Sequence, residues 1–452
     1  MTAQDAQTGS VAAGPVTAPG RLPTARHRRS RRMALGRPTV PSGIAVAAGN
    51  ASGILIGLAS GIVTARFLGP AARGAFVATQ TMSGVAAVVL TLGVTQAVVT
   101  DRGSDSDLVG PLLTQVAAVV LAATVMFGVL AGTGAQPWLG VFGVVGAAAA
   151  TTGAVASSLA SGMAQRRSRM TGEFQIVRLV PSLAGLFLLV VAWRAGTRDV
   201  GVWLLCSGAG VAVPAVMMLV RTLGGLGKLR GLARIVPSRA LVQSAVAALP
   251  TAIGAQVIYR LDSVVVAATL PTASVAFYGI AATASLTCTA LGQAVGMVAF
   301  SRLRHARGPD QQRLLIRRGV KWALSVAAGV ALPVAILVPE LITVCYGREF
   351  LPAVDPTRAL VLAAIPLSAD YLLIHALLSL SSQRSVYGTQ ALAATLTIAG
   401  LCVTVPTGNL TLVATASIAV YTLSAALMFG AVLRRTAPGR TAPNRAAFAE
   451  QS

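Results

Sequence analysis

The stretch LVGPLLTQVAAVVLAATVMFGVLAG, residues 108–132, runs for 25 residues without a charged side chain. An α-helix rises about 1.5 Å per residue, so this length crosses the hydrocarbon core of a bilayer, which is about 30 Å thick. Across all 452 residues, 55% are hydrophobic, 11% are charged and the mean hydropathy is +0.74. A soluble protein of this size needs far more charge to cover its surface. The stretch therefore predicts an all-α integral membrane protein.

Apolar runs of similar length recur on both sides of this stretch. They lie at about 43–65, 75–99, 138–163, 173–193, 200–220, 241–269, 273–300, 320–339, 357–380, 387–406 and 410–433. Together with 108–132 they predict twelve transmembrane helices in a multi-pass protein. Residues 1–40 form a basic N-terminal tail and residues 435–452 a C-terminal tail, and both are predicted to be disordered. A translation start at Met33 stays open as an alternative.

The positive charges fix the predicted orientation. Of the 36 Lys and Arg residues, 28 fall in the tails and in alternate loops that share one side with the N-terminus, and two fall within apolar runs. Loops rich in Lys and Arg stay on the cytoplasmic side of a membrane. Both termini are therefore predicted to be cytoplasmic. The six outer residues are Arg66, Arg73, Arg194, Arg198, Arg348 and Arg358.

The basic stretch at 222–239 divides the predicted helices into two sets of six. We expect an N-terminal bundle at 41–221 and a C-terminal bundle at 240–434, joined by this cytoplasmic linker. An even number of helices in each half gives both halves the same orientation, as in parallel repeats. A weak similarity at an offset of about 202 residues aligns 65–83 with 267–285, although chance similarity between Ala-rich helices remains an alternative.

Four glycines lie along one face of the first predicted helix. Gly49, Gly53, Gly57 and Gly61 are spaced four residues apart. Small residues at this spacing allow two membrane helices to approach closely. The sequence predicts close packing along this face, and a gating helix that bends at glycine is the alternative.

Two hairpins carry a family resemblance. The segment ARFLGPAARGAF (65–76) closes the first helix with a Leu-Gly-Pro turn, and YRLDSVVVAATLPTASVAFYGIAATAS (259–285) has an Asp, an apolar stretch, a short turn and a Tyr. In their order and spacing they resemble the polysaccharide-flippase branch of the multidrug/oligosaccharidyl-lipid/polysaccharide exporter superfamily. With the twelve-helix layout, the resemblance extends over about 43–435.

The resemblance implies a V-shaped pair of six-helix bundles around a central cavity. It also implies a flippase that moves undecaprenyl-pyrophosphate-linked oligosaccharide from the inner to the outer leaflet of the cytoplasmic membrane by alternating access. A lipid II flippase and a small-molecule or drug antiporter are alternatives. Lipid II flippases carry several arginines in the middle of their first two helices, and this chain has none at 43–65 or 75–99. A membrane glycan polymerase or ligase is a further alternative, although the longest outer segment is short.

Charges inside the membrane are costly and often functional. Asp370 falls close to the middle of the tenth predicted helix, and a carboxylate there could bind a coupling cation or exchange a proton; a helix-packing Asp is the alternative. Asp262 lies in the outer half of the seventh helix and is expected to pair with a neighbouring helix. Arg260, two residues earlier, could line the cavity and bind pyrophosphate through its planar fork, or extend to the membrane surface.

Three further arginines are candidate contacts for the substrate. Arg178 lies near the cytoplasmic start of the fifth helix, where it could receive the diphosphate or extend to the interface. Arg66 and Arg73 flank the first outer turn and could hold glycan or phosphate at the exit, or act as ordinary interfacial charges.

No motif predicts an enzyme or a cofactor. The four cysteines are widely spaced, without metal-ligand spacing, so no metal site is expected, and the only predicted ligand of this kind is a coupling Na⁺ or H⁺. The expected partners are the lipid-linked glycan, anionic lipids at the basic cytoplasmic loops and glycan-assembly enzymes. The net charge of +23 does not indicate nucleic acid, because the basic residues follow membrane topology.

Overall fold

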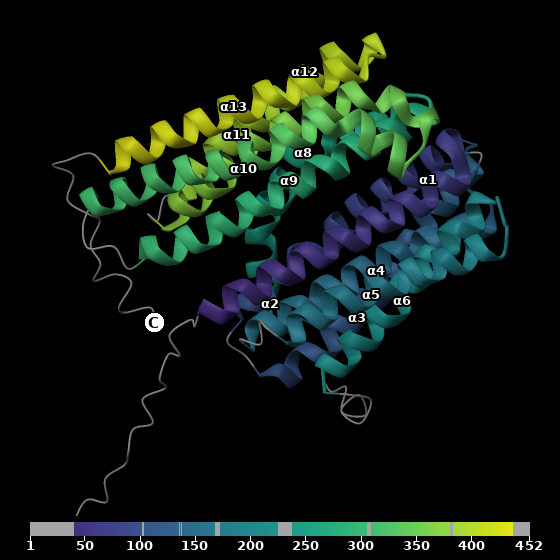
Figure 1. Ribbon diagram of the computed structural model, residues 1–452. Coiled ribbons are helices and arrows are strands. Elements are labelled where there is room, and N and C mark those ends of the chain that lie inside the picture. Colours follow the sequence, from purple (N-terminus) through teal and green to yellow (C-terminus); the bar gives the residue numbers. More distant parts are fainter. Residues whose placement is uncertain are drawn as a thin grey trace, which may run out of the picture. The chain divides into compact units, whose positions relative to one another are not determined.

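The computed structural model describes residues 40–101, 104–134, 136, 138–167, 172–224, 237–304, 309–379 and 383–436. The predicted disordered tails and most of the basic linker lie outside these ranges. Each of the twelve predicted spans lies largely within α-helix, with a break at residues 92–93 inside the second span (Figure 1). The helices are α1 (Val40–Thr91), α2 (Val94–Thr100), α3 (Asp105–Gly132), α4 (Val141–Arg166), α5 (Glu173–Arg194), α6 (Val200–Thr222), α8 (Arg239–Thr269), α9 (Thr272–Arg304), α10 (Pro309–Cys345), α11 (Val354–Ser379), α12 (Gln383–Thr404) and α13 (Leu410–Arg435).

The first two predicted spans share α1. They are separated by a single non-helical residue, Gly69, whose φ of 71° and ψ of 176° reverse the chain. Glycine tolerates a positive φ because it has no Cβ, and Pro70 then begins the next helical segment with its φ already suited to a helix. The Leu-Gly-Pro turn of the sequence is therefore a one-residue break between two membrane-length helices.

The outer surfaces of the helices are suited to lipid. In the part of the chain that the structure describes, nine helices are long and apolar enough to cross a membrane, and one of them, within α1, holds two predicted spans. Large apolar side chains such as Val141, Ile336 and Val403 are more than 70% exposed. A water-soluble protein would bury such residues or use them in an interface. The protein is a multi-pass membrane protein.

The helices contact one another mainly within two sets. In the first set, α4 packs against α3, α5 and α6, and α1 and α2 pack against α4. In the second, α11 packs against α9, α10 and α13, while α12 contacts α8 and α13. Figure 1 shows α10, α11, α12 and α13 running side by side. Contacts also join the two sets, above all between α1 and α9, and the two predicted six-helix bundles, the V shape and the cytoplasmic termini stay predictions.

The helix ends that are predicted to be cytoplasmic meet in a network of ion pairs. Arg166, at the end of α4, binds Asp101 after α2 at 2.8 Å and Asp105 at the start of α3 at 3.1 Å. Arg167 contacts the other oxygen of Asp105 at 2.8 Å and donates to the carbonyl of Thr222 at the end of α6. Four helix ends of the first set are thereby tied together.

The predicted glycine stripe makes only part of the expected contacts. A Cβ on Gly49 would overlap the side chain of Gln175, so α1 approaches α5 closely there. At Gly53 and Gly57 a Cβ would meet nothing within 4 Å, so the expectation of close packing is wrong at these two positions. Tight glycine packing occurs instead between α4 and α6.

We expect Gly208→Val to destabilise the first set of helices. A Cβ at Gly208 of α6 would lie 2.1 Å from the carbonyl oxygen of Gly146 in α4, and backbone cannot yield as a flexible side chain can. Overpacking of this kind costs about 1–3 kcal/mol or more. Thermal unfolding in detergent measures the effect. Gly128→Val in α3 is the matched control, because its Cβ meets nothing within 4 Å, and an equal loss in both variants would contradict the expectation.

Candidate transport site

Asp370 joins three helices of the second set. Its carboxylate, on α11, is 1% exposed. One oxygen accepts a hydrogen bond from the Tyr259 hydroxyl of α8 at 3.2 Å, and the other accepts from Ser424 of α13 at 2.8 Å. Both bonds come from neutral donors, so they compensate for only part of the cost of burying a charge.

Asp262 is a second buried carboxylate, on α8. Tyr278 of α9 donates to one oxygen at 2.6 Å, and the backbone N–H of Ser263 donates to the other at 2.6 Å. The residue is 6% exposed and lines a small cavity with Thr397 and Ser417. The expected pairing with a neighbouring helix is thus present as a hydrogen bond between the Asp and the Tyr of the 259–285 hairpin.

Tyrosines link the two carboxylates into one cluster. The ring of Tyr259 stacks on Tyr371 with 5.2 Å between centroids and lies 6.4 Å from Tyr421. Tyr421 and Ser417 line the same small cavity as Asp262, so the ring of Tyr421 lies between that carboxylate and Tyr259, which binds Asp370. We call the set formed by the two aspartates, these three tyrosines, Tyr278, Ser417 and Ser424 the carboxylate cluster.

The carboxylate cluster has the chemistry of a small-cation site. Within the described ranges, neither aspartate forms an ion pair with Lys, Arg or His. Ionised carboxylates offer about four lone-pair positions each, and the hydrogen bonds described above occupy only part of them. Oxygen-rich surroundings of this kind suit a hard cation or a transferable proton.

Arg73 is buried, unlike an ordinary interfacial charge. Its side chain is 3% exposed, and it donates from α1 to the carbonyl oxygen of Ala276 in α9 at 3.2 Å. The guanidinium lies 5.0 Å from the ring centroid of Tyr346 and 5.3 Å from that of Phe350. Its Nε has no hydrogen-bond partner among the described residues. We call this arrangement the Arg73 cage.

The two hairpins at 65–83 and 267–285 meet at the Arg73 cage. A Cβ on Gly74 of α1 would lie 1.6 Å from the carbonyl oxygen of Thr272, the first residue of α9. Ala65 belongs to the same buried cluster as Ala276. The ends of α1 and α9 that are predicted to lie on the outer side are thus in direct backbone contact in this structure.

The other three arginines are exposed and lie outside the two clusters, although Arg260 interacts electrostatically with Asp262 of the carboxylate cluster. Arg66 is exposed and donates to the carbonyls of Val344 and Cys345, so it caps the C-terminus of α10. Arg178 is exposed, with its guanidinium 5.4 Å from the ring centroid of Phe174. Arg260 is also exposed on α8. Their predicted roles in substrate binding stay predictions.

Sequence reasoning noted Tyr278 only as part of the family resemblance and missed the other tyrosines and the serines of the carboxylate cluster. The chain has only six tyrosines, and four of them belong to this cluster while a fifth, Tyr346, belongs to the Arg73 cage. A scarce side chain with a hydroxyl, placed repeatedly within apolar helices, was the available signal, because a buried phenol needs a partner.

Comparison with known families gives a match that includes both hairpins. The sequence profile of the polysaccharide biosynthesis protein family matches residues 63–355, well over half of the chain. The chain belongs to this family. No curated protein matches its sequence.

Solved structures show which fold the chain has. The lipid II flippase MurJ, in an inward closed conformation, superposes with a TM-score of 0.69 at 10% identity, covering 87% of this chain and 89% of that one. An inward-facing multidrug resistance transporter of the MATE family gives 0.64 at 13% identity, covering 87% and 98%. A point mutant of the Vibrio cholerae MATE transporter VcmN gives 0.52 at 16% identity, covering 87% and 97%. The chain has the fold of the multidrug/oligosaccharidyl-lipid/polysaccharide exporter superfamily.

Proposed function

We propose that this protein is a flippase of the cytoplasmic membrane. It moves undecaprenyl-pyrophosphate-linked oligosaccharide from the inner to the outer leaflet, for cell-surface or exported polysaccharide, by alternating access. The observation that carries the proposal is the family match over 63–355, within a fold shared with flippases and transporters. The two sets of helices and the contacts between them are the parts that such a cycle would move.

The carboxylate cluster is the proposed coupling site. Asp370 binds Na⁺ or exchanges a proton, with Asp262 as the second carboxylate of the same cluster. A cation that binds one state of the transporter more tightly than the other shifts the balance between those states. The hydrogen bonds of Asp370 join α11 to α8 and α13. A change in the charge of Asp370 therefore alters the contacts between these three helices.

The Arg73 cage is the proposed outer closure. A guanidinium stacked on two aromatic rings gains about 2 kcal/mol or more when it is desolvated. The cage and the Gly74 contact join α1 to α9 and to the segment after α10, and they must separate before a large headgroup can leave. The exposed cations that could contact the diphosphate are then Arg66, Arg178 and Arg260. A planar guanidinium binds a phosphate group through two oxygens.

Leaflet exchange in vesicles tests the proposal. Purified protein is reconstituted with fluorescent undecaprenyl-pyrophosphate oligosaccharides, and we expect exchange about tenfold or more above that of empty vesicles, since uncatalysed passage of so polar a headgroup through hydrocarbon is strongly opposed. Arg260→Ala is expected to slow exchange. Arg358→Ala is the matched control, because this exposed arginine pairs with Asp355 and donates to the carbonyl of Ala335. Rates equal to those of empty vesicles, across several glycans, would remove the proposal.

A lipid II flippase is the second candidate, favoured by the superposition on MurJ. The same vesicles with fluorescent lipid II in place of the oligosaccharide separate the two, and a fluorescent cationic dye tests the antiporter alternative. Exchange of lipid II alone would support the second candidate and contradict the first.

A further inference from the structure

A strained break separates α2 from α1. Leu92 has a φ of 51° and is the only residue other than glycine with a positive φ in the part of the chain that the structure describes. Gly93, which precedes α2, follows with a φ of 70°. A positive φ brings the Cβ of an ordinary residue too close to its own backbone, so it persists only where surrounding contacts hold it. The seven residues of α2 therefore form a separate helix with its own contacts.

Polar contacts attach α2 to α4. The hydroxyl groups of Thr95 in α2 and Ser158 in α4 share a hydrogen bond of 2.8 Å. Arg166, at the end of α4, forms its ion pair of 2.8 Å with Asp101, the residue that follows α2, and also donates to the carbonyl of Val98 at 3.4 Å. These directional contacts, near both ends of α2, hold it to the first set of helices.

The same short helix also contacts α8 of the second set. A Cβ on Gly93 would lie 2.3 Å from the carbonyl oxygen of Ala245 in α8. Ala97 of α2 shares a buried apolar cluster with Leu241 and Ala245 of α8. Apolar packing is non-directional, unlike the hydrogen bonds and the ion pair that join α2 to α4. The helix α2 thus has a polar attachment to one set and apolar packing against the other.

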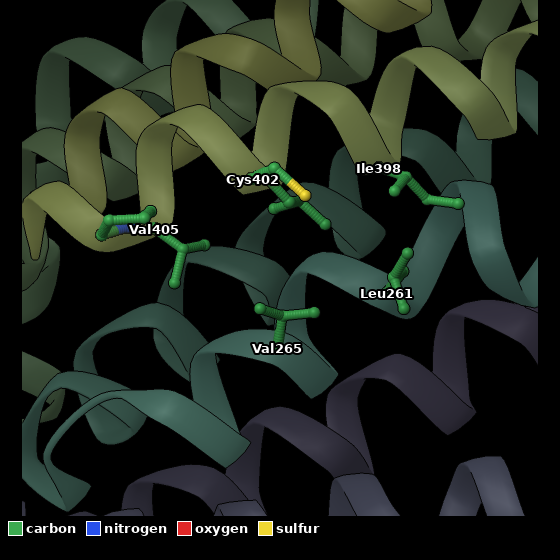
Figure 2. A pocket seen from close by; sticks show the side chains of 7 residues that line it. Leu261, Val265, Ile398, Cys402 and Val405 are labelled. Atoms are coloured by element: carbon green, nitrogen blue, oxygen red, sulfur yellow. The ribbon is translucent and has the colours of Figure 1, made fainter.

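The rest of α8 is packed within the second set. Figure 2 shows Leu261 and Val265 of α8 facing Cys402 of α12. In the same turn of α8, Asp262 accepts its hydrogen bond from Tyr278 of α9. The contact between α2 and α8 therefore joins a helix that is attached to the first set to a helix that is attached to the second.

The contact between α2 and α8 is far along the chain from the contact at Gly74. Gly93 follows Gly74 by 19 residues, which is about 28 Å of α-helix, and the hydrocarbon core of a bilayer is about 30 Å thick. Gly74 meets Thr272 of α9 at the end that is predicted to be outer, whereas Gly93 meets α8 at the end that is predicted to be cytoplasmic. The two sets are thus in contact near both ends of the second predicted span.

We propose that α2 is the inner closure of the transporter: it stays attached to α4 and parts from α8 when the space between the two sets opens to the cytoplasm. The structure, in which both contacts are made, is then closed on both sides. Leu92 and Gly93 form the joint, since a few residues at the ends of elements absorb the φ and ψ changes of such movements. This closure rests on the proposed function only for alternating access, whatever lipid is transported.

Labelling from the inner side tests this closure without any substrate. A single cysteine replaces Ala97, which is 1% exposed, after the four native cysteines are replaced, and an impermeant maleimide is added to inside-out vesicles. Ala245→Phe adds volume within the contact and should raise the labelling rate about tenfold, since parting α2 from α8 relieves the overpacking. Val246→Phe is the matched control, because Val246 is 58% exposed. Equal labelling in the two variants, or faster labelling from the outer side alone, would overturn the closure.

A disulfide shows which partner α2 keeps during transport. Thr95→Cys with Ser158→Cys places two thiols where hydroxyl oxygens lie 2.8 Å apart, so oxidation links α2 to α4 with little movement. We expect lipid exchange at the same rate before and after oxidation, because α2 never leaves α4. Exchange that is lost on oxidation and restored by reduction would contradict the inner closure. No exchange in either form, with the expected labelling at Ala97, would contradict the proposed function alone.

Discussion

Asp370→Asn is expected to abolish transport driven by an ion gradient. The amide has nearly the shape of the carboxylate, and its oxygen accepts one of the two hydrogen bonds from Tyr259 and Ser424. The other hydroxyl can rotate to accept from the amide NH₂, so the fold is kept while the charge is removed. Without that charge, the site keeps only the Asp262 carboxylate to balance a cation in the hydrocarbon region, and we expect gradient-driven exchange to fall about tenfold or more.

The matched variant at the same site is Ser424→Ala. It removes the donor at 2.8 Å but keeps the carboxylate, and the loss of one hydrogen bond to a charged group costs about 1.5–3 kcal/mol. Exchange should therefore keep its response to the gradient, at lower protein stability. Imposed Na⁺ and pH gradients, applied separately to the vesicles, identify the coupling ion. A normal gradient response in Asp370→Asn would contradict the role of this residue.

Gly74→Val is expected to separate the outer ends of α1 and α9. The new Cβ would lie 1.6 Å from the carbonyl oxygen of Thr272 and 2.4 Å from its carbonyl carbon. Both atoms are backbone, so the overlap is relieved only by moving one helix away from the other. That movement also draws Arg73 away from Ala276 and from the rings of the cage. We expect exchange to fall about tenfold, because the cycle loses its closed outer state.

Labelling from outside measures this opening. A single cysteine at Ala276, which is 0% exposed, is introduced after the four native cysteines are replaced. An impermeant maleimide should react about tenfold faster in Gly74→Val than in the parent, in proportion to the population of the open state. Gly84→Val is the matched control on α1, since its Cβ meets nothing within 4 Å. Equal labelling in the two glycine variants would mean that the Gly74 contact does not close the outer side.

Helix positions could be predicted because lipid imposes a minimum apolar length. The run at 108–132 became α3, Asp105–Gly132, which begins after Ser104, whose side chain accepts from the N–H of Ser106. The predicted spans were shorter than the observed helices where a helix extends beyond the hydrocarbon core. The predicted span at 320–339 corresponds to α10, Pro309–Cys345, whose first turns carry basic residues. An apolar criterion cannot detect a helix that continues as a charged segment outside the membrane.

Site residues could be predicted singly, but their partners could not. Asp370 and Asp262 were recognisable because a carboxylate in an apolar run needs a compensating interaction. The hydroxyls that bind Asp370 come from positions 111 and 54 residues away in the chain. Likewise, Arg73 looked like a surface charge beside a turn, since nothing near it in sequence indicates a cage. Contacts between distant helices depend on packing that a single sequence does not encode locally.

The Arg73 cage also has a consequence for biogenesis. Ala276, which accepts the hydrogen bond of Arg73, lies 203 residues further along the chain, and the two rings of the cage come later still. At a synthesis rate of about 5–20 residues per second, the first hairpin waits roughly 10–40 s before any part of its cage has been made. During this interval the guanidinium must stay hydrated at the membrane surface. The newly inserted N-terminal half therefore carries an exposed cation that is withdrawn from water only when the second half has entered the bilayer.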